Sequence, residues 1–394
     1  MQKIYELEKA SVRMEGYDGR RFLAMMTSVH FVNDGFEMIV PTLLPVISVA
    51  LSLSYPQIGL VGGALVVSMG LGQVFVGAFS DYFGHKKRLI IAGLVLVSAA
   101  FLIMAASQGF YSMLAANLMA GFGLSIYHPV GVAMIANRYD EKQGKAMGVH
   151  GSGGNAGMFL FPLLAGVLAD VIGWRLALAT FPVLGLAMAA LYALYVVEEP
   201  FSLSSFEPKK LLIPALATII LAMGLFNMAV RGFIVFFPVT LGTIGTGSSL
   251  TGGFMSLFFG VGIVGQYLGG WLSDNREMRV SLAVTSAISA VAMYVAIQSP
   301  NTPALMVPAL MVAGLGVHMV WPLFFVIYSK TTPAGMRGTG LGAFFSMGYL
   351  FASTSPVIMG HLGSAFSPSA SHIVIVTTGI GCALVMALMR LRRS

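Results

Sequence analysis

Three formally charged side chains, Asp34, Glu37 and Arg231, lie within long apolar stretches and are the residues most in need of a chemical explanation. A carboxylate at bilayer depth costs about 2.5 to 3.5 kcal/mol, so it normally faces protein or a water-filled cavity and has a functional role there. Asp34 and Glu37 are three positions apart, which on a helix places them on one face together with His30. We expect this face to point away from lipid.

The composition predicts a membrane protein that contains no cofactor. Hydrophobic residues make up 57% of the chain and charged residues 9%, whereas a soluble domain has about a quarter charged residues. Residues 1–19 are charged and polar, unlike a secretory signal, so we expect this segment to stay in the cytoplasm. The lone Cys382 excludes an internal disulfide. Neither CxxC nor His-x-x-x-His spacing occurs, so we expect no cofactor and no metal site.

A requirement of about 20 apolar residues per crossing predicts an all-α membrane protein with twelve transmembrane helices. The predicted spans are 22–50, 57–80, 89–107, 111–137, 144–169, 174–197, 211–240, 249–272, 279–298, 303–329, 337–362 and 370–390. They divide the chain into a cytoplasmic segment (1–21), a six-helix bundle (22–197), a cytoplasmic linker (198–210) and a second six-helix bundle with a short cytoplasmic tail (211–394).

The distribution of basic residues supports this topology. Twenty of the 22 Lys and Arg residues fall in or beside the predicted cytoplasmic segments, and the exceptions are Arg175 and Arg231. This asymmetry predicts that both termini lie in the cytoplasm, with the protein in the inner membrane of a prokaryote. The basic residues are scattered over short loops, so we expect no nucleic-acid partner.

The two predicted bundles are internal repeats of one another. Gly77 and Asp81 follow the second span, Gly270 and Asp274 follow the eighth, and both pairs differ by 193 positions. The dipeptides His128-Pro129 and Trp321-Pro322 share this offset. Parallel repeats of six spans are typical of transporters whose substrate site lies at mid-membrane between the halves.

The stretch GAFSDYFGHKKR (77–88) resembles the loop motif of the major facilitator superfamily, although Tyr82 stands where a basic residue usually follows the aspartate. The resemblance implies a cytoplasmic gate. We expect Asp81 to accept hydrogen bonds from the start of the eleventh span near 332–335, and Asp274 from the fifth span near 142–144. The alternative is that either aspartate is a solvated loop residue. The gate candidates are Gly77, Asp81, Gly84, Lys86, Lys87, Arg88, Gly270 and Asp274.

Three further stretches, HFVNDGFEMIVPTLLP, GLSIYHPVG and GVHGSGGNAGMFLFPLLAG, resemble the fosmidomycin-resistance group of exporters within that superfamily. The group implies proton-coupled export, by antiport, of a small organic compound or drug. One alternative is a proton-coupled importer of an organic anion such as a carboxylate or phosphonate, which would suit a lone Arg231. Another is a non-transporting sensor or biogenesis factor on the same fold. No Walker lysine loop or nucleophile elbow is present, so we do not expect an enzyme.

The internal repeat predicts a partner for Arg231. Its counterpart at the 193 offset is Met38, which neighbours Glu37, and spans one and seven are symmetry mates across the central cavity. We hypothesise a switchable ion pair between Arg231 and Glu37 or Asp34. Because a guanidinium stabilises the charged form of a carboxylate, moving Arg231 away would turn its partner into a proton acceptor. A static bridge that holds the halves together is the competing interpretation.

Polar residues in the other spans complete the predicted site. Pro129 removes a backbone donor and is expected to bend the fourth span. The glycine pairs 144/148, 153/157, 265/269 and 338/342 are expected to let spans five and eight, and two and eleven, pack closely. We expect a monomer that binds protons and a small molecule in the bilayer. The cavity candidates are His30, Asn33, Asn117, Tyr127, His128, His150, Asn155, Asn227, His318 and Trp321.

Overall fold

The computed structural model describes residues 19–139, 143–198, 214–273, 278–331 and 337–389, and the regular structure in them is helical. The first half contains α2 (Gly19–Ala50), α3 (Tyr55–Phe83), α4 (Lys86–Ala106), α5 (Phe110–Ser125), α6 (Tyr127–Arg138), α7 (Gln143–Ile172) and α8 (Trp174–Tyr195). The second half contains α9 (Pro214–Thr243), α10 (Ser248–Ser273), α11 (Met278–Gln298), α12 (Pro303–Thr331), α13 (Arg337–Ala365), α14 (Pro368–Ser371) and α15 (Ile373–Leu388).

These helices form twelve crossings, because α5 with α6 and α14 with α15 each make one. Among the described residues, eleven crossings are long and apolar enough to span a membrane, and α13 adds a further helix of 29 residues. The predicted fold of twelve helices in two six-helix bundles is confirmed, and the predicted span boundaries agree with the helices to within about three residues.

The fourth crossing is broken just before Pro129, as its sequence predicts. Proline has no backbone N–H, and its ring clashes with the carbonyl group four residues earlier, here that of Ser125. The backbone N–H of Ile126 donates to Gly123 O, three residues back, at 3.4 Å. This break separates α5 from α6, so the polar residues Tyr127 and His128 lie at the start of a separate helix.

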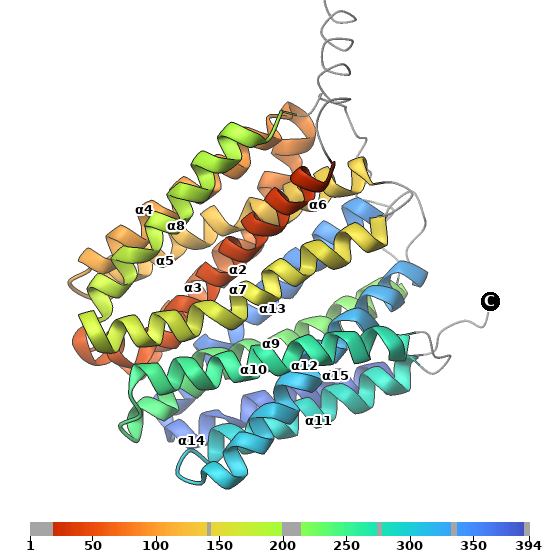
Figure 1. Ribbon diagram of the computed structural model, residues 1–394. Coiled ribbons are helices and arrows are strands. Elements are labelled where there is room, and N and C mark those ends of the chain that lie inside the picture. Colours follow the sequence, from red (N-terminus) through yellow and green to blue (C-terminus); the bar gives the residue numbers. More distant parts are fainter. Residues whose placement is uncertain (1–18, 140–142, 199–213, 274–277, 332–336, 390–394) are drawn as a thin grey trace, which may run out of the picture.

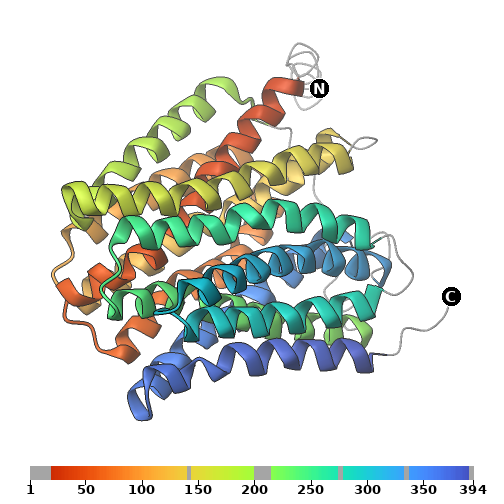
Figure 2. The same cartoon turned by 60° about the horizontal axis from the view of Figure 1, so that its bottom comes forward.

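The two halves lie side by side, and the axes of their long helices have similar directions (Figure 1). Between them, α3 packs along α13, α7 along α10, and α2 against α9. Figure 2 shows the same arrangement from another side. We call the end of the bundle opposite the start of α2 and the end of α15 the distal end.

Near the distal end the halves pack backbone against backbone. A Cβ atom built on Gly59 of α3 would collide with the carbonyl oxygen of Pro356 in α13. One built on Gly252 of α10 would collide with the carbonyl oxygen of Pro162 in α7. Glycine at these positions therefore lets the helices of opposite halves approach closely.

The helix pairs that were expected to pack closely do so, α7 with α10 and α3 with α13, but the predicted glycine pairs with described surroundings do not supply these contacts. Gly153 and Gly157 of α7 pack against α2, within the first half, and Gly265 and Gly269 of α10 pack against α12, within the second. A Cβ on Gly144, Gly148 or Gly270 would have no described heavy atom within 4 Å. A small-residue pattern marks a smooth helix face, but each helix in a bundle has several neighbours, so the pattern alone does not show which neighbour a given glycine contacts. The pair 338/342 lies outside the residues whose surroundings are described.

Arg175, one of the two basic residues outside the predicted cytoplasmic segments, has a structural role. Its Nη1 donates to the carbonyl oxygens of Ala105 at 2.9 Å and Ser107 at 2.6 Å, where α4 ends. Its guanidinium lies over the ring of Trp174, 4.2 Å from the centroid. A cation at a helix C-terminus satisfies free carbonyl groups and complements the helix dipole.

Candidate substrate and proton site

Helix α2 carries the polar side chains of the site into the centre of the protein. His30, Asn33, Asp34 and Glu37 are all buried, and Asp34 and Glu37 are each 7% exposed. Positions 30, 34 and 37 lie on one side of a helix because the period is 3.6 residues. The flanking helices therefore hold both carboxylates inside the protein.

Glu37 forms an ion pair with Arg231 of α9, which belongs to the other half. Arg231 Nη2 donates to Glu37 Oε1 at 2.5 Å, and the two side chains are 5% and 9% exposed. The 193-residue offset predicted an ion pair of Arg231 with Glu37 or Asp34. The structure shows that the partner is Glu37. The pair joins the two halves at the middle of their crossings.

Asp34 instead contacts residues of its own half. Its Oδ2 lies 2.9 Å from His30 Nε2, and its Oδ1 lies 3.3 Å from His128 Nε2 of α6. Asn33 Nδ2 also donates to Oδ1, at 3.2 Å. We call His30, Asp34 and His128 the histidine–aspartate cluster.

A second layer of residues orients this cluster. His30 Nδ1 lies 2.9 Å from the carbonyl oxygen of His150 in α7, and the two imidazole rings stack with their centroids 4.2 Å apart. The hydroxyl group of Tyr127 donates to the carbonyl oxygen of Met26 and lies 3.4 Å from His150 Nδ1. The ring of His30 is thereby held in a defined orientation.

Gly154 explains part of the glycine-rich stretch in α7. A Cβ atom built there would collide with Asp34 Oδ2 and with the ring of His30. Any side chain at this position would enter the space of the cluster, so glycine permits α7 to lie against it.

Two other cavity candidates lie at contacts between helices. Asn155 Nδ2 donates to the side-chain oxygen of Gln266 in α10, which joins the halves again. Asn227 of α9 lies one turn from Arg231, and a Cβ built on Gly348 of α13 would meet its amide nitrogen. Asn155 therefore lies at the surface between the halves, whereas the described contact of Asn227 is within the second half.

The remaining candidates lie apart from the cluster. The amide of Asn117 donates to the Met113 carbonyl of its own helix at 3.1 Å. His318 Nδ1 donates to the Gly314 carbonyl at 2.8 Å, and its ring packs against Phe258 and Phe259. Trp321 packs against the rings of Phe325 and Phe345 and against the hydrophobic core. The described contacts of these three side chains are packing contacts, and their role in a substrate cavity stays a prediction.

Tyr349 of α13 is a site residue that the sequence analysis missed. It interacts electrostatically with Glu37, Asp34 and Arg231. The internal repeat could have found it, because subtracting 193 gives position 156, which neighbours the candidate Asn155. Tyr349 adds a phenol from the second half to the site.

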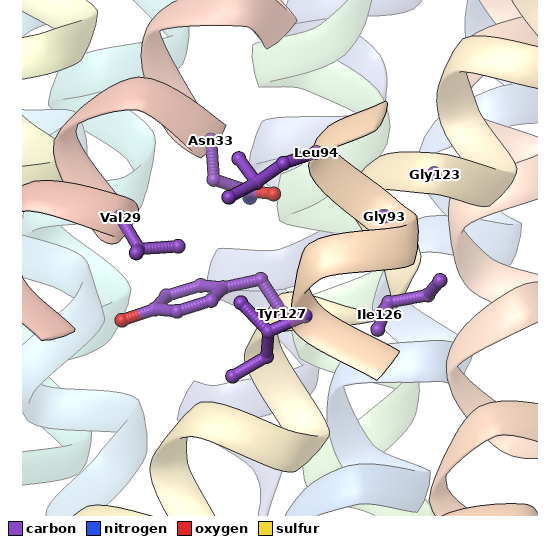
Figure 3. Close-up of a pocket in the computed structure, with 8 residues that line it drawn as sticks. Val29, Asn33, Gly93, Leu94, Gly123, Ile126 and Tyr127 are labelled. Carbon is purple, nitrogen blue, oxygen red and sulfur yellow. The ribbon is translucent and has the colours of Figure 1, made fainter. Parts of the chain in front are cut away.

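A small pocket lies behind Asn33, between α2, α4 and the α5–α6 break (Figure 3). Asn33 and the ring of Tyr127 line it, and the rest of its lining is apolar. The lining residues are Val29, Asn33, Ile90, Gly93, Leu94, Gly123, Ile126 and Tyr127. It lies wholly in the first half, away from the Arg231–Glu37 pair.

The described part of the gate motif is anchored within the first half. Gly84, with φ of 69°, ends α3, and Lys86, Lys87 and Arg88 form the first turn of α4. The backbone N–H of Lys87 donates to Glu198 Oε1 at 2.9 Å, and its Nζ to the Ala193 carbonyl at 2.6 Å. A Cβ on Gly77 would only touch Pro129. The Asp81 side chain, Asp274 and the expected partners at 332–335 lie outside the described residues.

Comparison with known proteins places this site in a wider context. The family model described as Major Facilitator Superfamily matches residues 26–356. The chain is 26% identical to the gentisate transporter of Corynebacterium glutamicum, over 98% of this chain and 92% of that protein. It is 23% identical to the cis,cis-muconate transport protein of Acinetobacter baylyi, over 93% and 92%.

Similarity to the fosmidomycin resistance protein of Escherichia coli, 26% identity, covers only 38% of this chain and 37% of that protein. The narrower resemblance drawn from the sequence thus holds for part of the chain only. Among solved structures, a bacterial homolog of the human lysosomal transporter Spinster superimposes with a TM-score of 0.76, over 94% of this chain and 95% of that one. At 15% identity, this likeness shows the fold alone.

Proposed function

The chain belongs to the major facilitator superfamily and is a transporter, and we propose that it carries a small organic anion together with a proton by alternating access of its two halves. The observation that carries this proposal is the buried Arg231–Glu37 pair, which joins the halves at mid-membrane. Arginine is always protonated and presents a planar fork of donors that matches a carboxylate. We assign Arg231 as the group that binds the anion.

Charge balance explains why the anion would bring a proton. Arg231 and Glu37 neutralise each other in a desolvated setting. Adding an anion would leave two negative groups beside one cation, which is costly at low dielectric. Protonation of Glu37 removes this excess and releases Arg231 for the substrate. Proton and anion would therefore bind together, which is the logic of a symporter and favours import.

The full-length relatives support the substrate class. The proteins named for gentisate and cis,cis-muconate align over more than nine tenths of the chain, and both named compounds are carboxylates. The anion site would lie between α2, α9 and α13, where Tyr349 and Asn227 add polar groups from the second half. We propose that the protein acts as a monomer in the inner membrane, with both termini in the cytoplasm and the distal end outside.

Uptake into proteoliposomes tests the proposal, with labelled gentisate and cis,cis-muconate as probes. An inside-alkaline pH gradient should drive accumulation by the native protein. Glu37→Gln, which imitates the protonated carboxyl group, should exchange labelled for unlabelled anion but should not accumulate it against the gradient. Arg231→Met should abolish both activities. Glu198→Gln is the matched control, because Glu198 follows the end of α8 and accepts a hydrogen bond from the first turn of α4, within the first half.

A second candidate is proton-coupled export by antiport, favoured by the partial match to the fosmidomycin resistance protein. The two candidates differ in the direction of proton movement. Under symport, adding the anion outside unenergised vesicles should make the outer medium more alkaline, whereas antiport would acidify it. Normal gradient-driven accumulation by Glu37→Gln would contradict the proposed coupling. Absence of exchange for a wide panel of carboxylates and phosphonates would favour a non-transporting role.

A further inference from the structure

The histidine–aspartate cluster has the composition and spacing of a metal site. One ligand atom each from His30, Asp34 and His128 lies within 4.8 Å of the others. The i, i+4 pair on α2 supplies His30 and Asp34, and His128 comes from α6 after the break at Ile126. Imidazole nitrogens and carboxylate oxygens are the ligands that Zn²⁺ takes in proteins.

The hydrogen bonds of His30 leave a place for a cation. Its Nδ1 lies 2.9 Å from the His150 carbonyl oxygen, which can only accept, so Nδ1 carries a hydrogen. In a neutral imidazole, Nε2 then presents a bare lone pair. That lone pair faces Asp34 Oδ2 at 2.9 Å. Two lone pairs at this distance require a positively charged occupant between them, either a proton or a metal ion.

His128 provides an independent observation. Its Nε2 is buried and makes no hydrogen bond of regular geometry among the described residues. It lies within ion-pair distance of Asp34 Oδ1, at 3.3 Å. A buried polar atom without a regular hydrogen bond normally has an explanation. A lone pair directed at a shared ion would be one.

We propose that His30 Nε2, the Asp34 carboxylate and His128 Nε2 bind a divalent transition-metal ion of the Zn²⁺ class, with a fourth position open. In a tetrahedral site with bonds of about 2.0 Å, ligand atoms are about 3.3 Å apart. His30 Nε2 lies 2.9 Å from Asp34 Oδ2 and His128 Nε2 lies 3.3 Å from Asp34 Oδ1, so the carboxylate presents one oxygen to each imidazole. Mg²⁺ and Ca²⁺ fit poorly because they prefer six or more oxygen ligands.

The surroundings match those of natural metal sites. A metal-binding histidine almost always donates its second ring N–H to a carbonyl or carboxylate group, as His30 does to His150. The ligating carboxylate is usually hydrogen-bonded as well, as Asp34 is to Asn33. Gly154 leaves the space beside Asp34 and His30 free of a side chain. All ligands belong to one half, so the ion would move with that half.

Binding of Zn²⁺ to the purified, tag-free, full-length protein tests the site. Competition with a fluorescent chelator should give one tight site per chain, and Co²⁺ should give the strong visible absorption of a tetrahedral complex. His30→Ala and His128→Ala should each weaken binding at least tenfold. His361→Ala is the control, because His361 is exposed on α13 and bonds to its own helix at Val357. Unchanged thermal unfolding profiles would show that the variants are folded.

The proposal would be overturned if His30→Ala and His128→Ala bound Zn²⁺ as tightly as the native chain, or if His361→Ala weakened binding equally. It does not depend on the proposed anion transport, which is measured in metal-free buffer and rests on Arg231 and Glu37. Tight Zn²⁺ binding without anion exchange would sustain the metal site alone. Anion exchange without Zn²⁺ binding would refute the metal site and leave the transport proposal intact.

Discussion

A carboxylate at the distal end holds the two halves together, and its removal should be measurable. Asp170 lies in the last turn of α7, in the first half. Its Oδ1 accepts from the backbone N–H of Ser248 at 3.0 Å, and its Oδ2 from that of Ser249 at 2.7 Å. These two groups begin α10 of the other half, where the free N–H groups and the helix dipole favour an anion.

The size of the effect follows from this geometry. A carboxylate at a helix N-terminus contributes about 0.3 to 1 kcal/mol when exposed, and a charge-assisted hydrogen bond contributes about 1.5 to 3 kcal/mol when shielded. Asp170 is exposed, so water and salt weaken both contributions. We expect Asp170→Asn to destabilise the form in which the distal end is closed by about 1 to 2 kcal/mol relative to the open form. This lowers the ratio of closed to open forms about 5-fold to 30-fold.

Thiol labelling can report this ratio. Cys382 is the only cysteine of the chain and is buried, so Cys382→Ser provides a cysteine-free background. Val235 of α9 is fully buried, and its methyl groups lie against Gly62 of α3 in the other half. A maleimide should react with Val235→Cys only when the halves separate. Adding Asp170→Asn should raise the labelling rate about 5-fold to 30-fold, in line with the free-energy change.

Glu198→Gln is the matched control, because it also neutralises one carboxylate but acts between α8 and α4 within one half. It should leave the labelling rate of Val235→Cys unchanged. The reasoning fails if Asp170→Asn labels at the native rate, or if both variants accelerate labelling equally.

Three further predictions concern stability and the site. Arg175→Ala should lower the free energy of unfolding by about 1 to 3 kcal/mol, seen as a lower midpoint of thermal unfolding in detergent, and Arg175→Lys should recover part of it. Gly121→Ala should cost about 1 to 3 kcal/mol in the same assay, because the new Cβ would meet the backbone carbonyl of Leu65. Gly154→Ala should weaken Zn²⁺ binding at least tenfold, because its methyl group would displace Asp34. A cooperative unfolding transition would show that the variant is folded, and unchanged Zn²⁺ binding would contradict the assigned position of the ion.

The parts of the fold that depend on local sequence were predictable. A membrane crossing needs a long apolar segment, so hydropathy and length located the helices. The interruption of the fourth crossing at Ile126 was predictable from the chemistry of Pro129 alone. The cross-half partner of Arg231 was predictable for a different reason, because the internal repeat placed it opposite Met38, one residue from Glu37.

The parts that depend on packing were not predictable. The i, i+4 spacing placed His30 and Asp34 on one face, but His128 and His150 approach them only because α6 and α7 pack against α2. Local spacing patterns such as CxxC and His-x-x-x-His compare residues of one segment, so they could not group His128 with His30 and Asp34, which lie on another helix. Asp170 likewise resembles any loop-facing carboxylate until α10 is placed beside it.

The two carboxylates of α2 have partners in different halves of the protein, and we therefore expect them to have different roles. Asp34 and Glu37 are separated by about 60° around the helix axis, so Asp34 meets His128 of its own half while Glu37 meets Arg231 of the other. In the proposed alternating access, the described partners of Asp34 in the cluster would move with it and Arg231 would move relative to Glu37. Of these two carboxylates, Glu37 would therefore sense the conformational change. Substitutions at Glu37 should uncouple transport from the proton gradient, whereas His128→Ala should alter ion affinity and leave the coupling unchanged.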